Sequence, residues 1–530
     1  MISPKNIAAK PLKSNFSSVA LFTLSAITLQ SSPASSVTIG AYAVANHSNC
    51  GAGNIPGTIA ELDKFFDSSD LPSDFQKNFY WKDARVKQSE WIKEGDYQAS
   101  SETNFGFDGS DASVLTYIAS HGVTSSGVYK ALAGSRNFGG CYIPTTSLEL
   151  GNNASRYTIL STCQGLKIGT GDYPTSPGEN PSKTWKNSAK GLNCIFGYSN
   201  NMADDDMYGV YLLANLKDGR SSLSKAFMDA SESVSQDNIP AVLCYGASEQ
   251  DAGNYIESNS SFESQPRPNA ASAWVYRMMN PVTSVKSLNT EIPAVLRIAP
   301  KNLNVEKIAR IFLGNSLTKS GSAKNTKFSS NSGSVSYDLK TGTLRVQNLL
   351  IEAVKNDDVP SLNEAEQIAR HALKVSGLGK IAGDLTLSAT GEEMLGGAEG
   401  IKRILSRQFT YKQNLAGATS LSQQGSIDVT VGPGGAITQI RAALLDIDST
   451  FKAPLRPTTL GQRSDAVELL AIESVASKAP GASYKVIKQR IGYDAGNFHK
   501  SRVNAPAVIE VTVEAAQGEF KRNYVQKITL

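Results

Sequence analysis

The sequence predicts an α/β protein: a doubly wound, mostly parallel sheet, followed by an α+β C-terminal region. Three observations support this. Apolar runs of strand length occur at 37–47, 112–120, 156–161 and 239–246, and helical patterns separate them. These runs are continuous rather than alternating, which is typical of strands buried on both faces of a parallel sheet. Beyond residue 295 the pattern changes to helices followed by hairpins.

Between these strands the sequence predicts three helices and one further strand. Thr58 is a candidate N-cap for a helix over 58–69, whose apolar residues recur at helical spacing. The same spacing recurs at 207–216 and 221–234, and 192–199 has the pattern of a buried strand. This order implies alternating strands and helices, and in such sheets functional groups gather beyond the carboxyl ends of the strands.

Composition bounds the class of protein. The chain has 530 residues, of which 40% are hydrophobic and 19% charged, with a net charge of +4. This is ordinary globular material, and the basic residues are spread rather than clustered, so we expect no nucleic-acid partner. We divide the chain into a first domain at 37–260, a linker at 261–294 and an α+β region at 295–530.

The N-terminus has the order of a secretory signal. Three lysines precede the mostly apolar run 19–29, and small residues follow at 31–36. That run is too short to span a bilayer. We therefore expect a signal peptide over 1–36 and a secreted or periplasmic protein with no membrane attachment after its removal. The alternative is a disordered N-terminal tail.

Five cysteines follow this segment: Cys50, Cys141, Cys163, Cys194 and Cys244. Export permits disulfides, and an odd count leaves at least one thiol unpaired within the chain. If four of them pair, three connectivities are possible. We expect Cys163 to be the unpaired one because of its position after a strand.

Two strand ends carry reactive side chains. His121 and Gly122 follow the strand 112–120, and Cys163 follows the strand 156–161. If the strands are parallel neighbours, the imidazole and the thiol emerge at the same edge, and imidazole is the usual base for a nucleophilic thiol. The backbone N–H groups of Gly122 and Cys163 could then form an oxyanion hole. The ordinary alternatives are a small core cysteine and a structural histidine.

The stretches DASVLTYIASHG (111–122) and YTILSTCQGL (157–166) resemble the histidine and cysteine motifs of the caspase-like cysteine peptidases of clan CD, which include caspases, gingipains, separases and CHAT proteases. The segment 192–230 is similar to the CHAT segment that follows the cysteine. The resemblance implies that His121 is the general base or imidazolium partner, Cys163 the nucleophile and Gly122 an oxyanion donor. Many members read Gly-His-Gly, whereas Ser120 precedes the histidine here.

An acidic triplet lies between the strand 192–199 and the next helix. The resemblance to separases implies that a carboxylate here binds a basic P1 side chain. Asp204 is the first candidate, followed by Asp205 and Asp206. The alternative is that these residues stabilise the N-terminus of the helix.

We expect no metal and no cofactor. The four histidines are far apart in the sequence, and none lies in a zinc-binding motif. His47, at the end of the first strand, could lie near the site, but a surface role is preferred. Nucleotide-binding glycine motifs are absent.

The C-terminal region has helical patterns at 303–314, 362–377 and 465–478. Its helix-then-hairpin order resembles the PepSY and FTP modules of secreted metalloprotease propeptides, as one module or two, most closely over 411–440. Such modules inhibit or chaperone an attached peptidase, so the resemblance implies intramolecular inhibition as one role. A spacer or binding domain is the alternative.

The leading hypothesis is a secreted cysteine endopeptidase that cleaves protein or peptide substrates through an acyl-enzyme on Cys163. The second hypothesis is an exported binding or adhesion protein on an inactive caspase-like scaffold, favoured if Cys163 lies in a disulfide. A third is acyl transfer to an amine, which the same two residues can perform.

Overall fold

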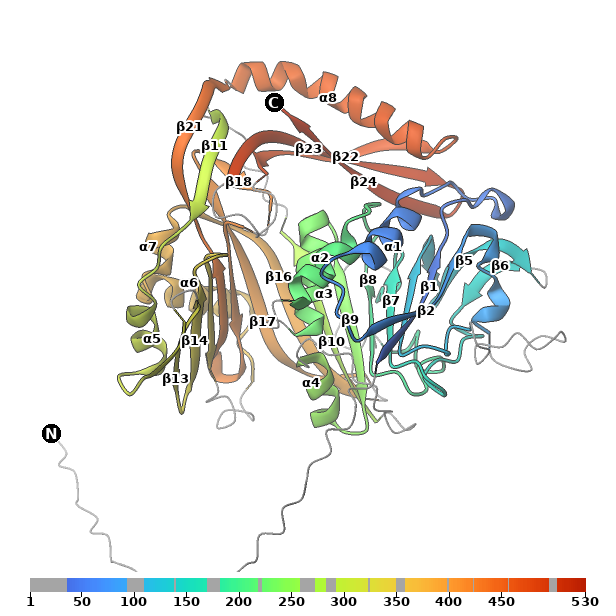
Figure 1. Cartoon of the computed structure of the whole chain (residues 1–530), viewed down its shortest axis with the longest axis horizontal. Coiled ribbons are helices and arrows are strands. Elements are labelled where there is room, and N and C mark those ends of the chain that lie inside the picture. The colour runs from blue at the N-terminus through green and yellow to red at the C-terminus, as the bar shows by residue number, and fades with distance from the viewer. Residues whose placement is uncertain are drawn as a thin grey trace, which may run out of the picture. The chain divides into compact units, whose positions relative to one another are not determined.

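Five parallel strands form the centre of the N-terminal half (Figure 1). They are β1 (Val37–Ala43), β2 (Phe75–Lys82), β3 (Leu115–Ala119), β7 (Tyr157–Ser161) and β8 (Cys194–Tyr198). Their order across the sheet is β2-β1-β3-β7-β8. Every residue of β3, β7 and β8 is buried, which explains why these stretches are continuous apolar runs.

The computed structural model describes residues 36–92, 109–137, 140–168, 182–217, 222–257, 272–282, 292–322, 325–348, 358–397, 400–422, 424–455, 457–494 and 503–530. Apart from Ser36, the expected signal peptide at 1–36 lies outside these residues. Residues 36–530 form one compact unit. No described helix is both long and apolar enough to cross a membrane.

Four helices cover one face of this sheet. They are α1 (Gly57–Asp67), α2 (Tyr208–Lys217), α3 (Leu223–Val234) and α4 (Glu249–Glu257). Their apolar side chains share one core cluster with alternate residues of the strands. The helices predicted at 58–69, 207–216 and 221–234 are therefore present within a few residues of the expected bounds.

The other face has no α-helix in its core cluster among the described residues, so helical cover on both faces is not observed. A small antiparallel sheet and irregular segments cover it instead. The small sheet consists of β4 (Gly122–Ser125), β5 (Val128–Asn137) and β6 (Gly140–Pro144). Side chains such as Tyr129 and Trp185 supply the apolar area that a second helical layer would have provided.

The sheet continues without interruption into the C-terminal half. β9 (Pro240–Gly246) is antiparallel to β8, and β10 (Ala273–Pro281) pairs with β9 on one side and β16 (Leu385–Gly397) on the other. Residues 273–281 belong to the expected linker at 261–294, and that prediction is wrong for them. The reason is the apolar sequence AWVYRMM, which is mostly buried between two neighbouring strands.

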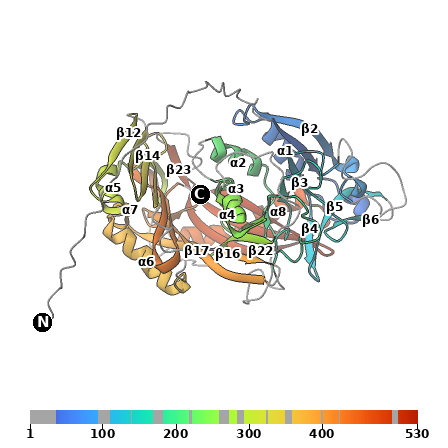
Figure 2. The ribbon, with the colours of Figure 1, turned by 90° about the horizontal axis from the view of Figure 1, so that it is seen from below.

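Beyond β16 the sheet adds antiparallel strands, with helices packed on them. Two helices, α5 (Val305–Leu313) and α6 (Leu362–Val375), share a core cluster with strands of this region. The short α7 (Leu378–Ala382) follows α6. In Figure 2 these helices lie at one end of the view and the small sheet β4–β6 at the other. The strands are β12 (Thr318–Ser322), β13 (Asn325–Ser330), β14 (Gly333–Asp338), β15 (Thr343–Asn348), β17 (Gly400–Leu415), β18 (Ala418–Ser420), β19 (Ser426–Val431) and β20 (Ile437–Ala443).

A last helix-and-strand unit lies across the carboxyl edge of the parallel strands (Figure 1). It consists of α8 (Pro457–Lys478), β22 (Ser483–Tyr493), β23 (Val503–Gln517) and β24 (Phe520–Thr529). The buried side of α8 packs on β23. Strands β11 (Ile292–Pro300) and β21 (Leu445–Leu455) connect this unit to the rest of the chain.

Candidate active site

His121 and Cys163 leave the sheet at the same edge. β3 and β7 are parallel neighbours in a register that places Ala119 opposite Ser161. His121 comes two residues after Ala119, and Cys163 comes two residues after Ser161. The two loops touch, since a Cβ atom on Gly122 would lie 2.5 Å from the carbonyl oxygen of Cys163. Gly122 is therefore required at this position by the close approach of backbone.

His121 has one ring nitrogen bound and one without a partner. Nε2 lies 2.7 Å from the carbonyl oxygen of Gly53, while Nδ1 is buried with no hydrogen-bond partner. A carbonyl oxygen only accepts, so Nε2 carries the proton and Nδ1 carries the lone pair. Burial, assisted by the neighbouring His47, lowers the pKa of His121 well below its usual value, so the ring is neutral. The orienting group is a backbone carbonyl, which no side-chain motif could have revealed.

His47 is buried rather than on the surface, so its predicted surface role is wrong. Its ring centroid lies 4.8 Å from that of His121, and its Nε2 lies 3.1 Å from the carbonyl oxygen of Val44. Burial lowers the pKa of His47 to about 3.

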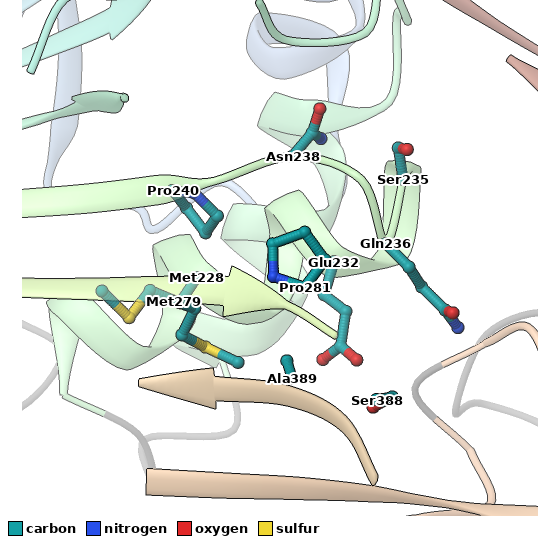
Figure 3. Close-up of a pocket in the computed structure, with 10 residues that line it drawn as sticks. All are labelled: Met228, Glu232, Ser235, Gln236, Asn238, Pro240, Met279, Pro281, Ser388 and Ala389. Carbon is teal, nitrogen blue, oxygen red and sulfur yellow. The ribbon is translucent and has the colours of Figure 1, made fainter. Parts of the chain in front are cut away.

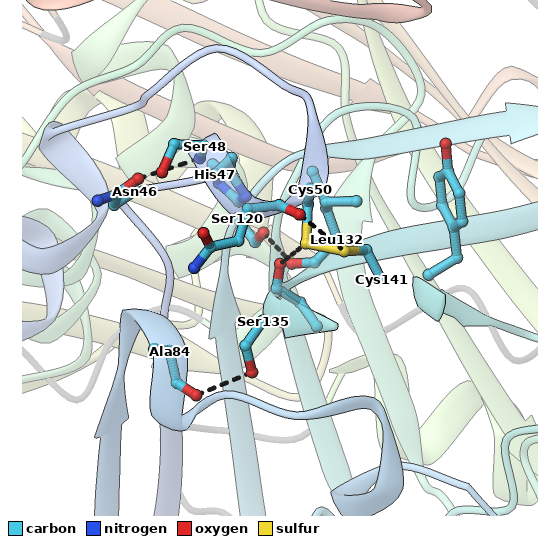
Figure 4. The surroundings of a disulfide bond; sticks show 12 residues. Asn46, His47, Ser48, Cys50, Ala84, Ser120, Leu132, Ser135 and Cys141 are labelled. Carbon is cyan, nitrogen blue, oxygen red and sulfur yellow. Dashed lines mark hydrogen bonds between the residues drawn. A yellow bond between two sulfur atoms is a disulfide. The ribbon is translucent and has the colours of Figure 1, made fainter. Parts of the chain in front are cut away.

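A disulfide between Cys50 and Cys141 fastens the loop after β1 to β6 (Figure 4). That loop carries His47 and also Gly53, whose carbonyl orients His121. The Ser120 side chain is accommodated here, because its hydroxyl donates to the Leu132 carbonyl of β5 at 2.5 Å.

The second disulfide joins Cys194 of β8 to Cys244 of β9. Cys163 is the free cysteine, which confirms the prediction from its position. Cys163 is therefore not in a disulfide, which was the feature that would have favoured an inactive scaffold.

Cys163 is covered by the beginning of β24. The residue is 0% exposed, and its Sγ donates to the carbonyl oxygen of Lys521 at 3.2 Å. The Arg522 Nη1 atom lies 3.9 Å from the same sulfur. Burial raises the pKa of the Cys163 thiol, and the nearby guanidinium opposes that rise. In this arrangement the residue is a neutral thiol beneath a polar cover.

The residue after the cysteine holds a left-handed backbone conformation. Gln164 has φ +58°, which is uncommon for a residue with a side chain. Thr124 fixes it twice: its N–H donates to Gln164 Oε1 at 3.1 Å, and its hydroxyl donates to the Gln164 carbonyl at 2.7 Å. Strained turns of this kind occur at sites where a reactive side chain must be presented in one orientation.

The acidic triplet divides into one buried residue and two with structural roles. Asp204 is buried; its Oδ2 accepts from the N–H of Gly57, the first residue of α1, at 3.3 Å. Burial raises the pKa of Asp204, and the Arg522 guanidinium opposes that rise. Asp205 accepts from the N–H of Met207 at 2.8 Å just before α2, and Asp206 pairs with a surface lysine. Asp204 alone of the three lies beside Cys163's neighbour Arg522.

Glu61 is a further buried carboxyl group, and it was not among the sequence candidates. It is 0% exposed, and it accepts from the Tyr117 hydroxyl at 2.5 Å and from the Ser161 hydroxyl at 2.9 Å. Burial raises the pKa of Glu61 to about 8, with opposing effects of these hydroxyls and of Arg522. The sequence did hold a signal, since a glutamate beside Leu62 on the apolar face of a helix is unusual.

A separate hollow lies between the end of α3, β10 and β16 (Figure 3). Met228, Met279 and Ala389 line it, together with Glu232. The Glu232 carboxylate is already paired with Lys412 at 2.8 Å. We therefore place the candidate site at Cys163 and not in this hollow. Within the described ranges, no group of three or more potential ligands is arranged to hold a metal ion.

Comparison with known proteins adds a family match over the region that holds the site. Residues 42–278 match a family described as a domain of unknown function (DUF6345), a range that includes His121, Cys163 and Asp204. A solved structure of an uncharacterized protein from Eubacterium rectale ATCC 33656 is similar at 13% identity and a TM-score of 0.28. The similarity covers 46% of this chain and 82% of that one. No curated protein matches the chain.

Proposed function

We propose that this protein is an exported cysteine endopeptidase of the caspase-like type, with a preference for a basic P1 residue. One observation carries the proposal. A free thiol, Cys163, and an imidazole with an unpartnered Nδ1, His121, follow adjacent parallel strands in matched register. A thiol nucleophile and a neighbouring base are the two groups that acyl transfer requires.

The reaction follows from the protonation states. His121 Nδ1 takes the Cys163 proton, and the thiolate attacks the substrate carbonyl carbon, forming a C–S bond. The N–H groups of Gly122 and Cys163 stabilise the oxyanion. The imidazolium gives its proton to the leaving nitrogen as the C–N bond breaks, which leaves a thioester. Water then attacks the thioester, a carboxylic acid departs, and the thiol is restored.

The Gly53 carbonyl supports the imidazolium stage. It accepts from His121 Nε2 at 2.7 Å and so stabilises the positive ring during proton transfer. The disulfide at Cys50 holds the loop that carries this carbonyl. The geometry therefore favours a ring that is neutral at rest and charged only within the catalytic cycle.

Asp204 supports the basic P1 preference. A carboxylate that is buried against a helix N-terminus gains from a cationic partner, and a guanidinium already lies 3.5 Å away. Two disulfides support an oxidising, extracytoplasmic location, which agrees with the expected signal peptide.

The test is substitution of the nucleophile. We expect Cys163→Ala to abolish cleavage of fluorogenic peptides with Arg or Lys at P1, while peptides with Asp or Asn at P1 are poor substrates of the unaltered protein. Equal melting temperatures of the two proteins would show that the fold is kept. An active preparation whose rate survives this substitution would disprove the assignment.

One observation favours a second candidate, an inactive exported binding protein. The Cys163 sulfur is fully covered by the protein's own β24. If no peptide is cleaved even by variants in which β24 is released, the scaffold binds rather than cleaves.

A further inference from the structure

The first five residues of β24 are buried against the candidate site, with the exception of Lys521. Phe520, Arg522 and Tyr524 are 4%, 1% and 1% exposed, while the Lys521 side chain between them is 50% exposed. Phe520, Arg522 and Tyr524 share one face of the extended strand, because residues two positions apart point to the same side. Asn523, on the other face, is also buried, at 6% exposed. The first of these faces is turned toward His121, Cys163 and Asp204.

Arg522 occupies the position expected for a basic P1 side chain. Its Nη2 lies 3.5 Å from Asp204 Oδ1, and its Nη1 lies 3.9 Å from Cys163 Sγ. Both members of the ion pair are almost fully buried. A buried guanidinium is costly unless paired, so this one arginine depends on the carboxylate beneath it.

The main chain of the same segment is bound through an isolated parallel bridge between Ala203 and Asn523. The Asp204 N–H donates to the Asn523 carbonyl at 2.6 Å, and the Asn523 N–H donates to the Met202 carbonyl at 3.2 Å. The Asn523 side chain also donates to the Asn201 carbonyl at 2.6 Å. Extended peptides are recognised in this way, with backbone bonds for affinity and side-chain pockets for specificity.

The register keeps the segment from being cut after the arginine. The space beside Asp204 that the Arg522 side chain fills is here called the Asp204 pocket. For cleavage after a residue whose side chain lies in this pocket, the carbonyl carbon of that same residue must lie next to the Cys163 sulfur. Here the sulfur donates to the carbonyl oxygen of Lys521, which precedes Arg522. The Phe520 ring also packs against His121, with ring centroids 5.2 Å apart. The strand therefore fills the site without presenting the bond that the proposed reaction would break.

Polar contacts hold the rest of this unit on the N-terminal half. Asp237, in the loop before β9, pairs with Lys488 and Arg490 of β22 and accepts from the Thr512 hydroxyl at 3.1 Å. The Tyr142 hydroxyl donates to Glu519 at 2.7 Å. Interfaces with this much polar content resemble those between domains that separate and rejoin.

We infer that the hairpin β23–β24 is a built-in inhibitor that occupies the substrate cleft as a pseudosubstrate, with Arg522 in the Asp204 pocket. This inference rests on the proposed function and identifies the ligand of the cleft: an extended peptide with an arginine side chain, bound by strand addition to residues 202–204. The form described here is latent, and displacement of Phe520 and Arg522 opens it.

The test compares the full chain with Arg522→Ala and a matched control, Lys485→Ala, which removes an exposed cation from β22 of the same sheet. Two rates are measured: alkylation of Cys163 by iodoacetamide, followed by intact mass, and hydrolysis of an arginyl fluorogenic peptide. We expect both rates to rise at least tenfold in Arg522→Ala and to be unchanged in the control.

The two readouts separate the two claims. Unchanged alkylation in Arg522→Ala would overturn the inference, whatever the hydrolysis rate. Faster alkylation without any hydrolysis would support occupancy by the hairpin and disprove the peptidase. Should Arg522→Ala fail to fold, Phe520→Ala takes its place with the same expectations.

A second measurement uses the released site. A synthetic peptide of residues 518–526 should restore slow alkylation to Arg522→Ala in a dose-dependent way. The same peptide with alanine at position 522 should be at least tenfold weaker. Equal potency of the two peptides would contradict the assignment of the pocket.

Discussion

Two of the junctions between the halves of this molecule differ in kind. At the first, every residue of β10 from Ala273 to Pro281 is paired with β16, in a ladder that also includes β9. At the second, β24 meets the N-terminal half through an isolated bridge between Ala203 and Asn523 and through side chains. The first junction depends on backbone and buried apolar area, whereas the second depends on a few particular residues.

This difference teaches which contacts can open. A continuous ladder loses many hydrogen bonds together, so it separates only when the fold is lost. A junction made of a bridge and several polar side chains can open locally at much smaller cost. We therefore treat β9–β10–β16 as a fixed connection and β24 as a reversible one.

The largest expected effect breaks the fixed junction. Val275 is 0% exposed and lies opposite Cys244 and Leu395. Val275→Asp would bury an unpaired carboxylate, which costs several kcal/mol, so we expect no cooperative thermal transition by circular dichroism.

The matched substitution at the reversible junction is Phe520→Ala, which also removes a buried apolar side chain. Its melting temperature should stay within a few degrees of the unaltered protein, because β24 can undock without unfolding. A similarly large loss of thermal stability in both variants would show that the two junctions are of one kind.

Next in size is the loss of the pocket carboxylate. In an Arg522→Ala background, Asp204→Asn should lower kcat/KM for arginyl peptides about a hundredfold, equivalent to about 2.7 kcal/mol, since a desolvated charge pair with substrate is lost. Asp206→Asn in the same background is the control, because Asp206 pairs with Lys64 at the surface. If kcat/KM for arginyl peptides falls equally in the two variants, Asp204 does not select the substrate.

A smaller effect is expected from a polar contact that lies away from the site but helps to hold the reversible junction closed. Asp237→Asn removes the charge facing Lys488 and Arg490. We expect alkylation of Cys163 to be about tenfold faster, since β24 is then docked less firmly. Asp448→Asn, which alters an exposed ion pair with Arg297, should leave the rate unchanged. No acceleration in Asp237→Asn would mean that docking is local to residues 520–524.

The smallest effect concerns the buried carboxyl group of Glu61. Burial raises the pKa of Glu61 from 4.5 to about 8, so between these values the folded protein holds a proton that the unfolded chain releases. The free energy of unfolding therefore falls as pH rises through that window. We expect the melting temperature of Glu61→Gln to fall by a few degrees less than that of the unaltered protein between pH 5 and 8. Glu306→Gln, at an exposed position of α5, is the control. Equal slopes of melting temperature against pH in Glu61→Gln and the unaltered protein would contradict the shift.

The strand ends could be predicted because their signal is local. Continuous apolar runs mark β3 and β7, and the ends of these runs place His121 and Cys163, which follow them directly. The unpaired state of Cys163 followed from the odd cysteine count and the same placement. For the acidic triplet, sequence ranked Asp204 first, and the structure places that carboxylate beside Arg522.

Other parts could not be predicted because their signal is distant or lies in the backbone. The group that orients His121 is the Gly53 carbonyl, and every residue has a carbonyl. Arg522 reaches Cys163 across 359 positions of sequence, in a polar stretch with no distinctive pattern. The strand 273–281 was missed because polar neighbours on both sides made the region resemble a linker.

The cover over Cys163 also has a consequence for the survival of the protein in an oxidising medium. Thiolates there are converted to sulfenic acids and mixed disulfides, and accessible ones react first. A sulfur that is protonated, buried and bound to a backbone carbonyl is poorly suited to such chemistry. The same burial opposes thiol–disulfide exchange, so in such a medium the free cysteine would be retained in its reduced form.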